Sequence, residues 1–214
     1  MNIRSKYPLV IFDFDGTLAD SLPCLAGILN RLARQHHFRE IREDEREQLR
    51  TLDTLQLISA LGMSLWKLPA ILLQVRTLMA AEIRMISLFP GVAPMLMQLA
   101  DCGARLALVS SNSWANIEVV LGPELAQLFT DIECEATLFG KRSKLRRVLR
   151  TAKLTADQAI YIGDELRDLQ AAQAEKIAFG AVTWGHTPFE QFRSHQPAFL
   201  FQSREDLLSQ LIGP

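Results

Sequence analysis

The sequence is poor in cysteine and has almost no excess charge, and each shortage excludes a class of protein. The three cysteines (Cys24, Cys102 and Cys134) are widely spaced and form no CxxC pair, which excludes a disulfide scaffold and indicates a reducing compartment. Lys and Arg number 23 and Asp and Glu number 24, so the formal net charge is −1. No overall field therefore favours a nucleic acid or an anionic membrane as a partner.

Long apolar runs are also missing near the start of the chain. The opening segment MNIRSKYPLVIFDFDG holds only a few consecutive apolar residues before acidic ones begin, whereas a signal peptide or a transmembrane helix needs a longer run. We therefore expect a cytoplasmic protein with no membrane and no nucleic-acid partner. The 214 residues, 49% hydrophobic and 22% charged, are typical of one globular core domain with a modest insertion.

The chain does contain short apolar runs that alternate with helical stripes. Residues 9–12 predict a buried strand that ends abruptly in Asp13-Phe14-Asp15-Gly16-Thr17. Further strands are expected at 106–109, near 132, and at 159–162, 178–182 and 198–201, and helices at 92–102, 114–121, 143–150, 166–174 and from 203 onward. This alternation predicts an α/β fold with a doubly wound parallel sheet, similar to a Rossmann sheet.

Residues 20–86 interrupt the alternation with helical periodicity alone. Leu22, Leu25, Leu29 and Leu32 form one apolar stripe, a second helix is expected to end near Gly62, and a third is expected to begin at Pro69. No strand signal breaks this segment. We therefore expect an α/β core domain made of residues 1–19 and 87–214, with an inserted α-helical domain at residues 20–86.

Polar side chains follow three of the predicted strands at the point where each strand ends. Asp13 and Asp15 follow the first strand, Ser110-Ser111-Asn112 follows the strand at 106–109, and Gly163-Asp164 follows the strand at 159–162, while Lys141 lies just before the basic helix. The carboxyl ends of parallel strands meet at one edge of a sheet, where ligands bind. These groups are therefore expected to share one pocket.

Several neighbouring carboxylates, a hydroxyl and an ammonium suit phosphoryl transfer. Carboxylates that lie close together repel one another unless a cation neutralises them, and hard oxygen ligands favour Mg²⁺. A carboxylate can act as a nucleophile and form an aspartyl-phosphate, and Asp15, two residues beyond Asp13, can exchange a proton with the leaving oxygen and with water. Ser110 and Lys141 would steady the phosphoryl oxygens.

Four stretches of the sequence resemble motifs of the haloacid dehalogenase superfamily of phosphatases. Asp13-Phe14-Asp15-Gly16-Thr17-Leu18 resembles its first motif, Ser110 the second, Lys141 in Phe139-Gly140-Lys141 the third, and Gly163-Asp164-Glu165-Leu166-Arg167-Asp168 the fourth. The run Thr183-Trp184-Gly185, with Gln196-Pro197-Ala198, resembles the phosphoglycolate phosphatase-like branch. The helical insertion occupies the place of that family's cap domain.

The resemblance implies a role for each matching residue. Asp13 would be the phosphate-accepting nucleophile and a Mg²⁺ ligand, and Asp15 the general acid/base that also ligates the metal through its carbonyl. Asp164 would supply the other metal carboxylate. The remaining residues would bind the phosphoryl group (Ser110, Ser111, Asn112 and Lys141) or support the site (Gly16, Thr17, Gly163 and Asp168).

Two of these assignments have a rival nearby. Lys144 lies three residues beyond Lys141, but Lys141 keeps the more natural distance to the fourth motif, so Lys141 is preferred. Ser111 neighbours Ser110, which is preferred because it directly follows the apolar run LALV. His186 has no partner at the spacing of metal ligands and is expected at most at the mouth of the pocket.

The function expected from the sequence is Mg²⁺-dependent hydrolysis of a small phosphate monoester, with a small phosphorylated metabolite as partner and phosphoglycolate as one candidate. Alternatives are a phosphomutase on the same core, a receiver-like signalling domain, and a catalytically silent protein that binds a phosphorylated ligand. The long helical insertion directly after the first strand argues against the receiver. A monomer and a homodimer are both compatible with the sequence.

Overall fold

The computed structural model describes residues 4–45, 49, 52, 54–135 and 140–213. The chain divides into two compact units. The core unit comprises Met1–Asp20 and Leu88–Pro214, and the helical unit comprises Ser21–Ser87.

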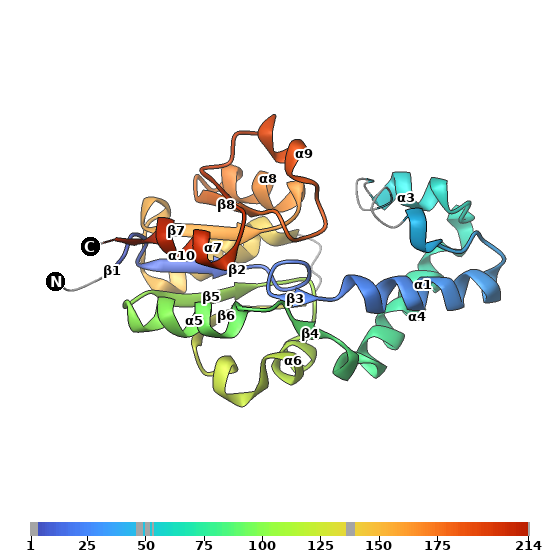
Figure 1. The fold of residues 1–214 in the computed structure, drawn as a ribbon, viewed down its shortest axis with the longest axis horizontal. Helices are drawn as coiled ribbons and strands as arrows, with labels where there is room; N and C mark the ends of the chain where they lie inside the picture. Colours follow the sequence, from blue (N-terminus) through green and yellow to red (C-terminus); the bar gives the residue numbers. More distant parts are fainter. Residues whose placement is uncertain (1–3, 46–48, 50–51, 53, 136–139, 214) are drawn as a thin grey trace. The chain divides into compact units, whose positions relative to one another are not determined.

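The core unit is built on a six-stranded sheet with the order β6-β5-β2-β7-β8-β9, in which every neighbouring pair is parallel. Its strands are β2 (Leu9–Phe12), β5 (Arg105–Val109), β6 (Phe129–Glu133), β7 (Ala159–Gly163), β8 (Ala178–Val182) and β9 (Phe199–Phe201). The chain runs outward from β2 to β6 and then returns to β7 on the other side of β2 (Figure 1). The predicted doubly wound parallel sheet is confirmed.

Helices cover both faces of this sheet, so its strands are apolar on both sides. The bounds are α5 (Val92–Asp101), α6 (Trp114–Ala126), α7 (Gly140–Ala152), α8 (Leu166–Ala174), α9 (Phe189–Arg193) and α10 (Arg204–Leu211). Leu9, Ile11 and Tyr161 pack with buried residues of α7, α8 and α9. Because successive strand residues face opposite ways, Val10 and Phe12 point to the other face, where α5 contacts α6 and α10.

Two of the core helices begin at a serine whose hydroxyl accepts a backbone hydrogen bond. The Ser113 hydroxyl accepts from the Asn116 amide at 3.3 Å at the start of α6, and Ser203 accepts from Asp206 at 3.1 Å at the start of α10. The sequence predicts that the first of these helices ends at residue 121. The structure continues α6 to Ala126, but it breaks the helix at Gly122, which has a φ of +71°.

Short strands and 3₁₀ turns complete the two units. β1 (Arg4–Ser5) pairs antiparallel with β10 (Ile212–Gly213), which joins the two ends of the described chain. β3 (Ala19–Asp20) and β4 (Ser87–Leu88) lie where the chain leaves and re-enters the core unit. The 3₁₀ turns are Glu43–Glu45, Leu65–Lys67, Ile83–Met85 and Ala156–Gln158.

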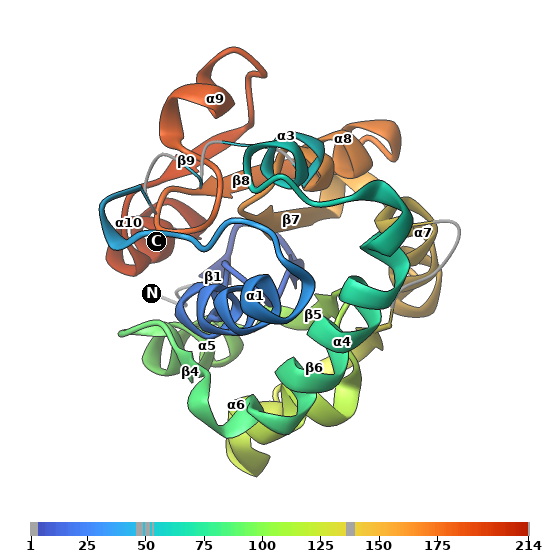
Figure 2. The same ribbon diagram turned by 90° about the vertical axis from the view of Figure 1, so that its right-hand side faces the viewer.

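The helical unit contains α1 (Leu22–His36), α3 (Thr54–Ala60) and α4 (Leu68–Ala81). α1 and α4 lie side by side (Figure 2), with Ile28 and Leu32 of α1 packed against Ile71 of α4. Pro69 stands in the first turn of α4, as expected from the fixed φ of proline. The second predicted helix corresponds to α3, whose last residue, Ala60, lies close to Gly62. Residues 46–48, 50–51 and 53, which the prediction also includes, are outside the described residues.

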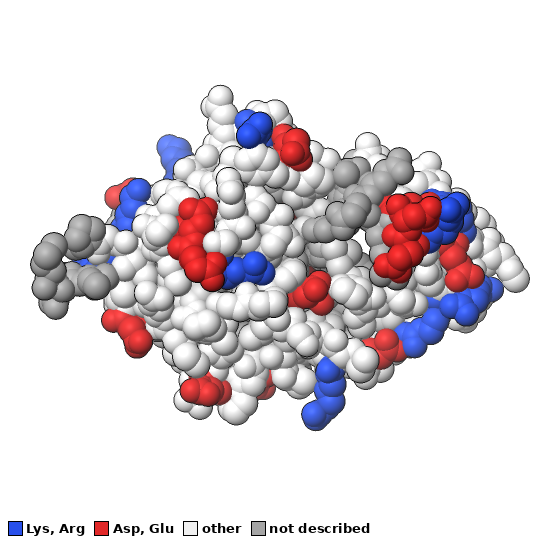
Figure 3. All heavy atoms as spheres, in the orientation of Figure 1, with Lys and Arg blue, Asp and Glu red and all other residues white. Residues whose placement is uncertain are grey.

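Two further observations bear on possible partners. Acidic and basic side chains are interspersed in small groups on the described part of the face in Figure 3, in keeping with the balanced composition. Every helix among the described residues is too short or too polar to span a lipid bilayer.

Candidate active site

The strand register brings the three predicted polar tips to one edge of the sheet. β2 lies between β5 and β7, and Phe12 is level with Leu108 on one side and Ile162 on the other. The next residue, Asp13, donates its backbone amide to the Ile162 carbonyl at 2.9 Å. The segments that begin at Ser110 and Asp164 therefore flank Asp13 at the carboxyl edge of the sheet.

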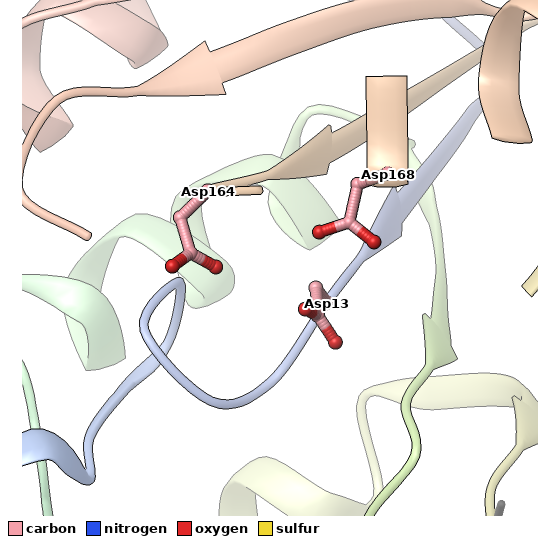
Figure 4. Close-up of side chains that lie close together, drawn as sticks. All are labelled: Asp13, Asp164 and Asp168. Atoms are coloured by element: carbon pink, nitrogen blue, oxygen red, sulfur yellow. The ribbon is translucent and has the colours of Figure 1, made fainter. Parts of the chain in front are cut away.

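Three buried carboxylates meet at this edge, those of Asp13, Asp164 and Asp168 (Figure 4). One oxygen of each lies within 4.8 Å of the others. Asp13 follows β2, Asp164 follows β7, and Asp168 comes from the first turn of α8. Asp168, which the sequence places only in a supporting role, is thus a full member of the cluster. An all-carboxylate oxygen set of this kind can hold a hard divalent cation.

Lys141, in the first turn of α7, places its ammonium between two of these carboxylates. Nζ lies 2.5 Å from Asp13 Oδ2 and 2.5 Å from Asp168 Oδ1, and the lysine side chain is only 9% exposed. Burial by itself would lower the pKa of Lys141, but the two carboxylates outweigh it and raise the pKa. Burial raises the pKa of Asp13, and the ammonium of Lys141 partly offsets that rise.

Asp15 is held by the loop that follows β5. The Asn112 amide nitrogen Nδ2 donates to Asp15 Oδ2 at 3.1 Å. The hydroxyl of Ser110, which is buried, accepts from the Asn112 backbone amide at 3.1 Å. Ser111 is exposed. Of the two neighbouring serines, therefore, Ser110 is the one buried at the sheet edge.

Asp164 is fixed by hydrogen bonds from both sides. Thr17 donates its hydroxyl to Oδ1 at 2.9 Å, and the His186 backbone amide donates to Oδ2 at 2.8 Å. The carboxylate also explains why position 16 holds a glycine. Gly16 has a φ of +77°, and a Cβ there would lie 2.2 Å from Asp164 Oδ2. Gly163 is confined in the same way, since its Cβ would lie 2.9 Å from Asp168 Oδ2.

His186, which the sequence places at most at the mouth of the pocket, contacts one of the clustered carboxylates. Its Nδ1 lies 3.0 Å from Asp164 Oδ2. Burial lowers the pKa of His186, but contact with the carboxylates of Asp164 and Glu165 raises it to about 10. The only sequence signal was the preceding Trp184-Gly185, and Trp184 itself donates Nε1 to the Thr17 carbonyl at 3.0 Å. The loop after β8 is therefore tied directly to the loop after β2.

Lys144, the rival of Lys141, points elsewhere. It lies three residues further along α7 and is 1% exposed. Its ammonium donates to the backbone carbonyls of Ser110 and Glu135. Lys141 is thus the lysine that contacts the carboxylate cluster. Phe139 of the proposed third motif lies outside the described residues.

Replacing Gly185 with alanine is expected to destabilise the core unit by about 1–3 kcal/mol, because an added methyl group overpacks this junction. A Cβ at Gly185 would lie 2.1 Å from Asp164 Cβ and 2.6 Å from the Gly16 carbonyl oxygen. The control is Gly27→Ala in α1, where no atom lies within 4 Å of the new Cβ. That helical change should stabilise by about 0.5–1 kcal/mol. Thermal unfolding of both variants measures the difference, and equal midpoints would contradict the close approach.

Comparison with known proteins agrees with the fold and identifies the family. A family model described as haloacid dehalogenase-like hydrolase matches residues 10–182. The chain is 34% identical over 200 residues to a phosphoglycolate phosphatase of Synechococcus elongatus, covering 93% of this chain and 94% of the relative. It is 28% identical over 208 residues to a phosphoglycolate phosphatase of Vibrio cholerae, covering 90% and 91%.

The fold is also found in solved structures. A haloacid dehalogenase-like family hydrolase from Streptococcus pneumoniae superposes with a TM-score of 0.83 at 20% identity, covering 94% of this chain and 97% of that one. At that identity the likeness concerns the fold alone. The family model and the sequence relatives also identify the family and the type of enzyme. The chain belongs to the haloacid dehalogenase-like hydrolase family and is a phosphatase of its phosphoglycolate phosphatase-like branch.

Proposed function

We propose that the core unit hydrolyses a small phosphate monoester with Mg²⁺, through an aspartyl-phosphate on Asp13. The observation that carries this proposal is the position of the Asp13 carboxylate. It lies at the carboxyl edge of the sheet, 2.5 Å from the Lys141 ammonium and in one cluster with Asp164 and Asp168. A carboxylate placed between a cation site and an ammonium can approach a phosphate whose negative charge would otherwise repel it.

The donor set fits a magnesium ion. All three clustered side chains offer hard oxygen ligands, and Asp168 Oδ2 is buried with no hydrogen-bond partner among the described residues. We assign the metal to the carboxylates of Asp13 and Asp164 and to the Asp15 carbonyl, with Asp168 supporting them. When bound, Mg²⁺ neutralises the carboxylates and the charge of the phosphoryl oxygens.

The residues of this chain divide the reaction into two displacements at phosphorus. An Asp13 carboxylate oxygen attacks the phosphorus atom, the ester P–O bond breaks, and Asp15 gives its proton to the leaving alkoxide. Asp15, now ionised, takes a proton from a water molecule, whose oxygen attacks phosphorus and breaks the bond to Asp13. Inorganic phosphate leaves, and Ser110 and Lys141 hold the phosphoryl oxygens in both steps.

Phosphoglycolate is the substrate we propose, because the relatives from Synechococcus elongatus and Vibrio cholerae are phosphoglycolate phosphatases.

We further propose that residues 20–86 form the cap that selects the leaving group and excludes water during the reaction. The free cysteines Cys24, Cys102 and Cys134 suit the cytoplasm as its location.

The test of this function is phosphate release from 2-phosphoglycolate and a panel of other small phosphate monoesters. We expect turnover with Mg²⁺, loss of turnover with EDTA, and recovery when Mg²⁺ is returned in excess. Among the esters, 2-phosphoglycolate should have the highest kcat/KM. Turnover that is unchanged by EDTA would refute the metal assignment, and a higher kcat/KM for another ester would refute the substrate.

A further inference from the structure

Lys144 is a second buried lysine of α7, and it donates hydrogen bonds to backbone carbonyls. The proposed reaction gives this residue no role. Lys144 is 1% exposed, and its Nζ donates to the Ser110 carbonyl at 2.5 Å and to the Glu135 carbonyl. Burial lowers the pKa of Lys144. An ammonium is costly to bury unless hydrogen bonds compensate for lost water. An apolar side chain would fill this position at lower cost, so the two carbonyl contacts require an explanation.

Both carbonyls belong to segments that are already bonded to each other beside the site. The Ser110 amide donates to the Glu133 carbonyl at 3.1 Å, and the Glu135 amide donates to the Asn112 carbonyl at 2.7 Å. Glu135 has a φ of +71°, a left-handed conformation that is unfavourable for a residue with a side chain. Lys144 thus ties α7 to the ends of β5 and β6 at a point where the backbone is strained.

The loop held in this way leads directly to Asp15. Asn112 donates its backbone amide to the Ser110 hydroxyl and its Nδ2 to Asp15 Oδ2. The orientation of the Asn112 side chain is fixed, because its Oδ1 accepts from the Ser113 amide at 2.9 Å and from Asn116 Nδ2 at 3.0 Å. A shift of the Ser110–Asn112 backbone would therefore move the hydrogen bond to Asp15.

We propose that Lys144 is a positioning residue of the phosphatase site, which holds the Ser110–Asn112 loop and, through Asn112, orients Asp15 for proton transfer. This inference rests on the proposed function of Asp15 as the general acid. Lys144 itself touches neither substrate nor metal in this account. Its effect is therefore expected in the step that needs a proton for the leaving group.

The experiment replaces Lys144 with methionine, which is similar in length and uncharged, and compares two esters in the Mg²⁺-loaded enzyme. An alkyl phosphate such as 2-phosphoglycolate needs its leaving oxygen protonated, whereas p-nitrophenyl phosphate has a good leaving group. We expect kcat on the alkyl ester to fall about 10–100-fold, with a several-fold smaller fall on p-nitrophenyl phosphate and a smaller change in KM. A purely structural loss would lower kcat on both esters by the same factor.

Three comparisons make the test specific. The quantity compared is the ratio of kcat on 2-phosphoglycolate to kcat on p-nitrophenyl phosphate. Arg150→Met removes an exposed cation from the same helix and should leave this ratio unchanged. Lys144→Gln keeps a donor and should recover part of the ratio. Asn112→Ala should lower the ratio, and combining it with Lys144→Met should add little, because residues that act through one contact are not additive.

A second readout does not depend on turnover. Solvent exchange of the Asn112 side-chain amide, followed by NMR, should be slow in the wild type and in Arg150→Met, and faster in Lys144→Met. Equal loss on both esters, or an unchanged Asn112 amide, would overturn the proposal. If Lys144→Met does not fold, the same two measurements on Lys144→Gln decide. A wild type without phosphatase activity would instead refute the proposed function, and the amide measurement would still test the positioning of Asn112.

Discussion

Replacing Asp13 with asparagine is expected to lower kcat by about 10⁴-fold or more, because the variant lacks the carboxylate that would accept the phosphoryl group. The amide has nearly the same shape, so packing around it should be preserved. Lys141 keeps its contact with Asp168 in the variant, which leaves the ammonium paired. Thermal unfolding should therefore show that the variant is folded, although its turnover is low. The measurement is phosphate release from 2-phosphoglycolate with Mg²⁺ present.

The control for Asp13→Asn is the same chemical change at a surface position. Asp157 is exposed in the 3₁₀ turn before β7. Asp157→Asn should keep the activity and unfolding midpoint of the wild type. Residual activity of Asp13→Asn within about tenfold of the wild type would show that Asp13 only assists another nucleophile.

Replacing Lys141 with methionine is expected to lower the free energy of unfolding by about 3–5 kcal/mol in metal-free protein. The change leaves the buried carboxylates of Asp13 and Asp168 without the ammonium that lies 2.5 Å from each. Urea unfolding in EDTA measures the loss. Because a cation bound to the native state stabilises it, adding Mg²⁺ should raise the stability of this variant more than that of the wild type.

A compensating change separates electrostatics from packing. Adding Asp168→Asn to Lys141→Met removes one of the two uncompensated charges, so the double variant should recover part of the lost stability. A double variant less stable than Lys141→Met would show that the lysine stem, and not its charge, supports the site. In both variants we expect turnover to be lost along with the phosphate-binding ammonium.

The sheet was predictable because its strands are buried on both faces. Residues 9–12 and 159–163 are continuous apolar runs, and every one of them is buried. The pairing of β1 with β10 could not be predicted, because strands of two residues have no periodicity. α9, five residues long, is too short for a helical stripe. Its buried Phe192 packs against Phe179 of β8.

Only those residues of the candidate site that directly follow a strand could be placed from the sequence. Asp13, Ser110 and Asp164 each follow a strand directly, so topology alone places them at one edge. The contact of His186 with Asp164 depends on how a loop folds back, which no spacing encodes. Lys141 and Lys144 lie three residues apart on α7, and only the structure shows that the first contacts carboxylates and the second contacts backbone carbonyls. The roles proposed for these residues stay predictions.

The covalent intermediate tests the central claim most directly. Asp15→Asn should slow attack by water, so that enzyme mixed with p-nitrophenyl phosphate and Mg²⁺ and then quenched in acid accumulates the phosphorylated form. Peptide mass spectrometry should then find the mass of one phosphoryl group on the segment that contains Asp13, and borohydride reduction of the acyl phosphate should convert Asp13 to homoserine. A phosphoryl group on any other residue, or substrate turnover by wild type with no phosphorylated enzyme in either protein, would contradict the account.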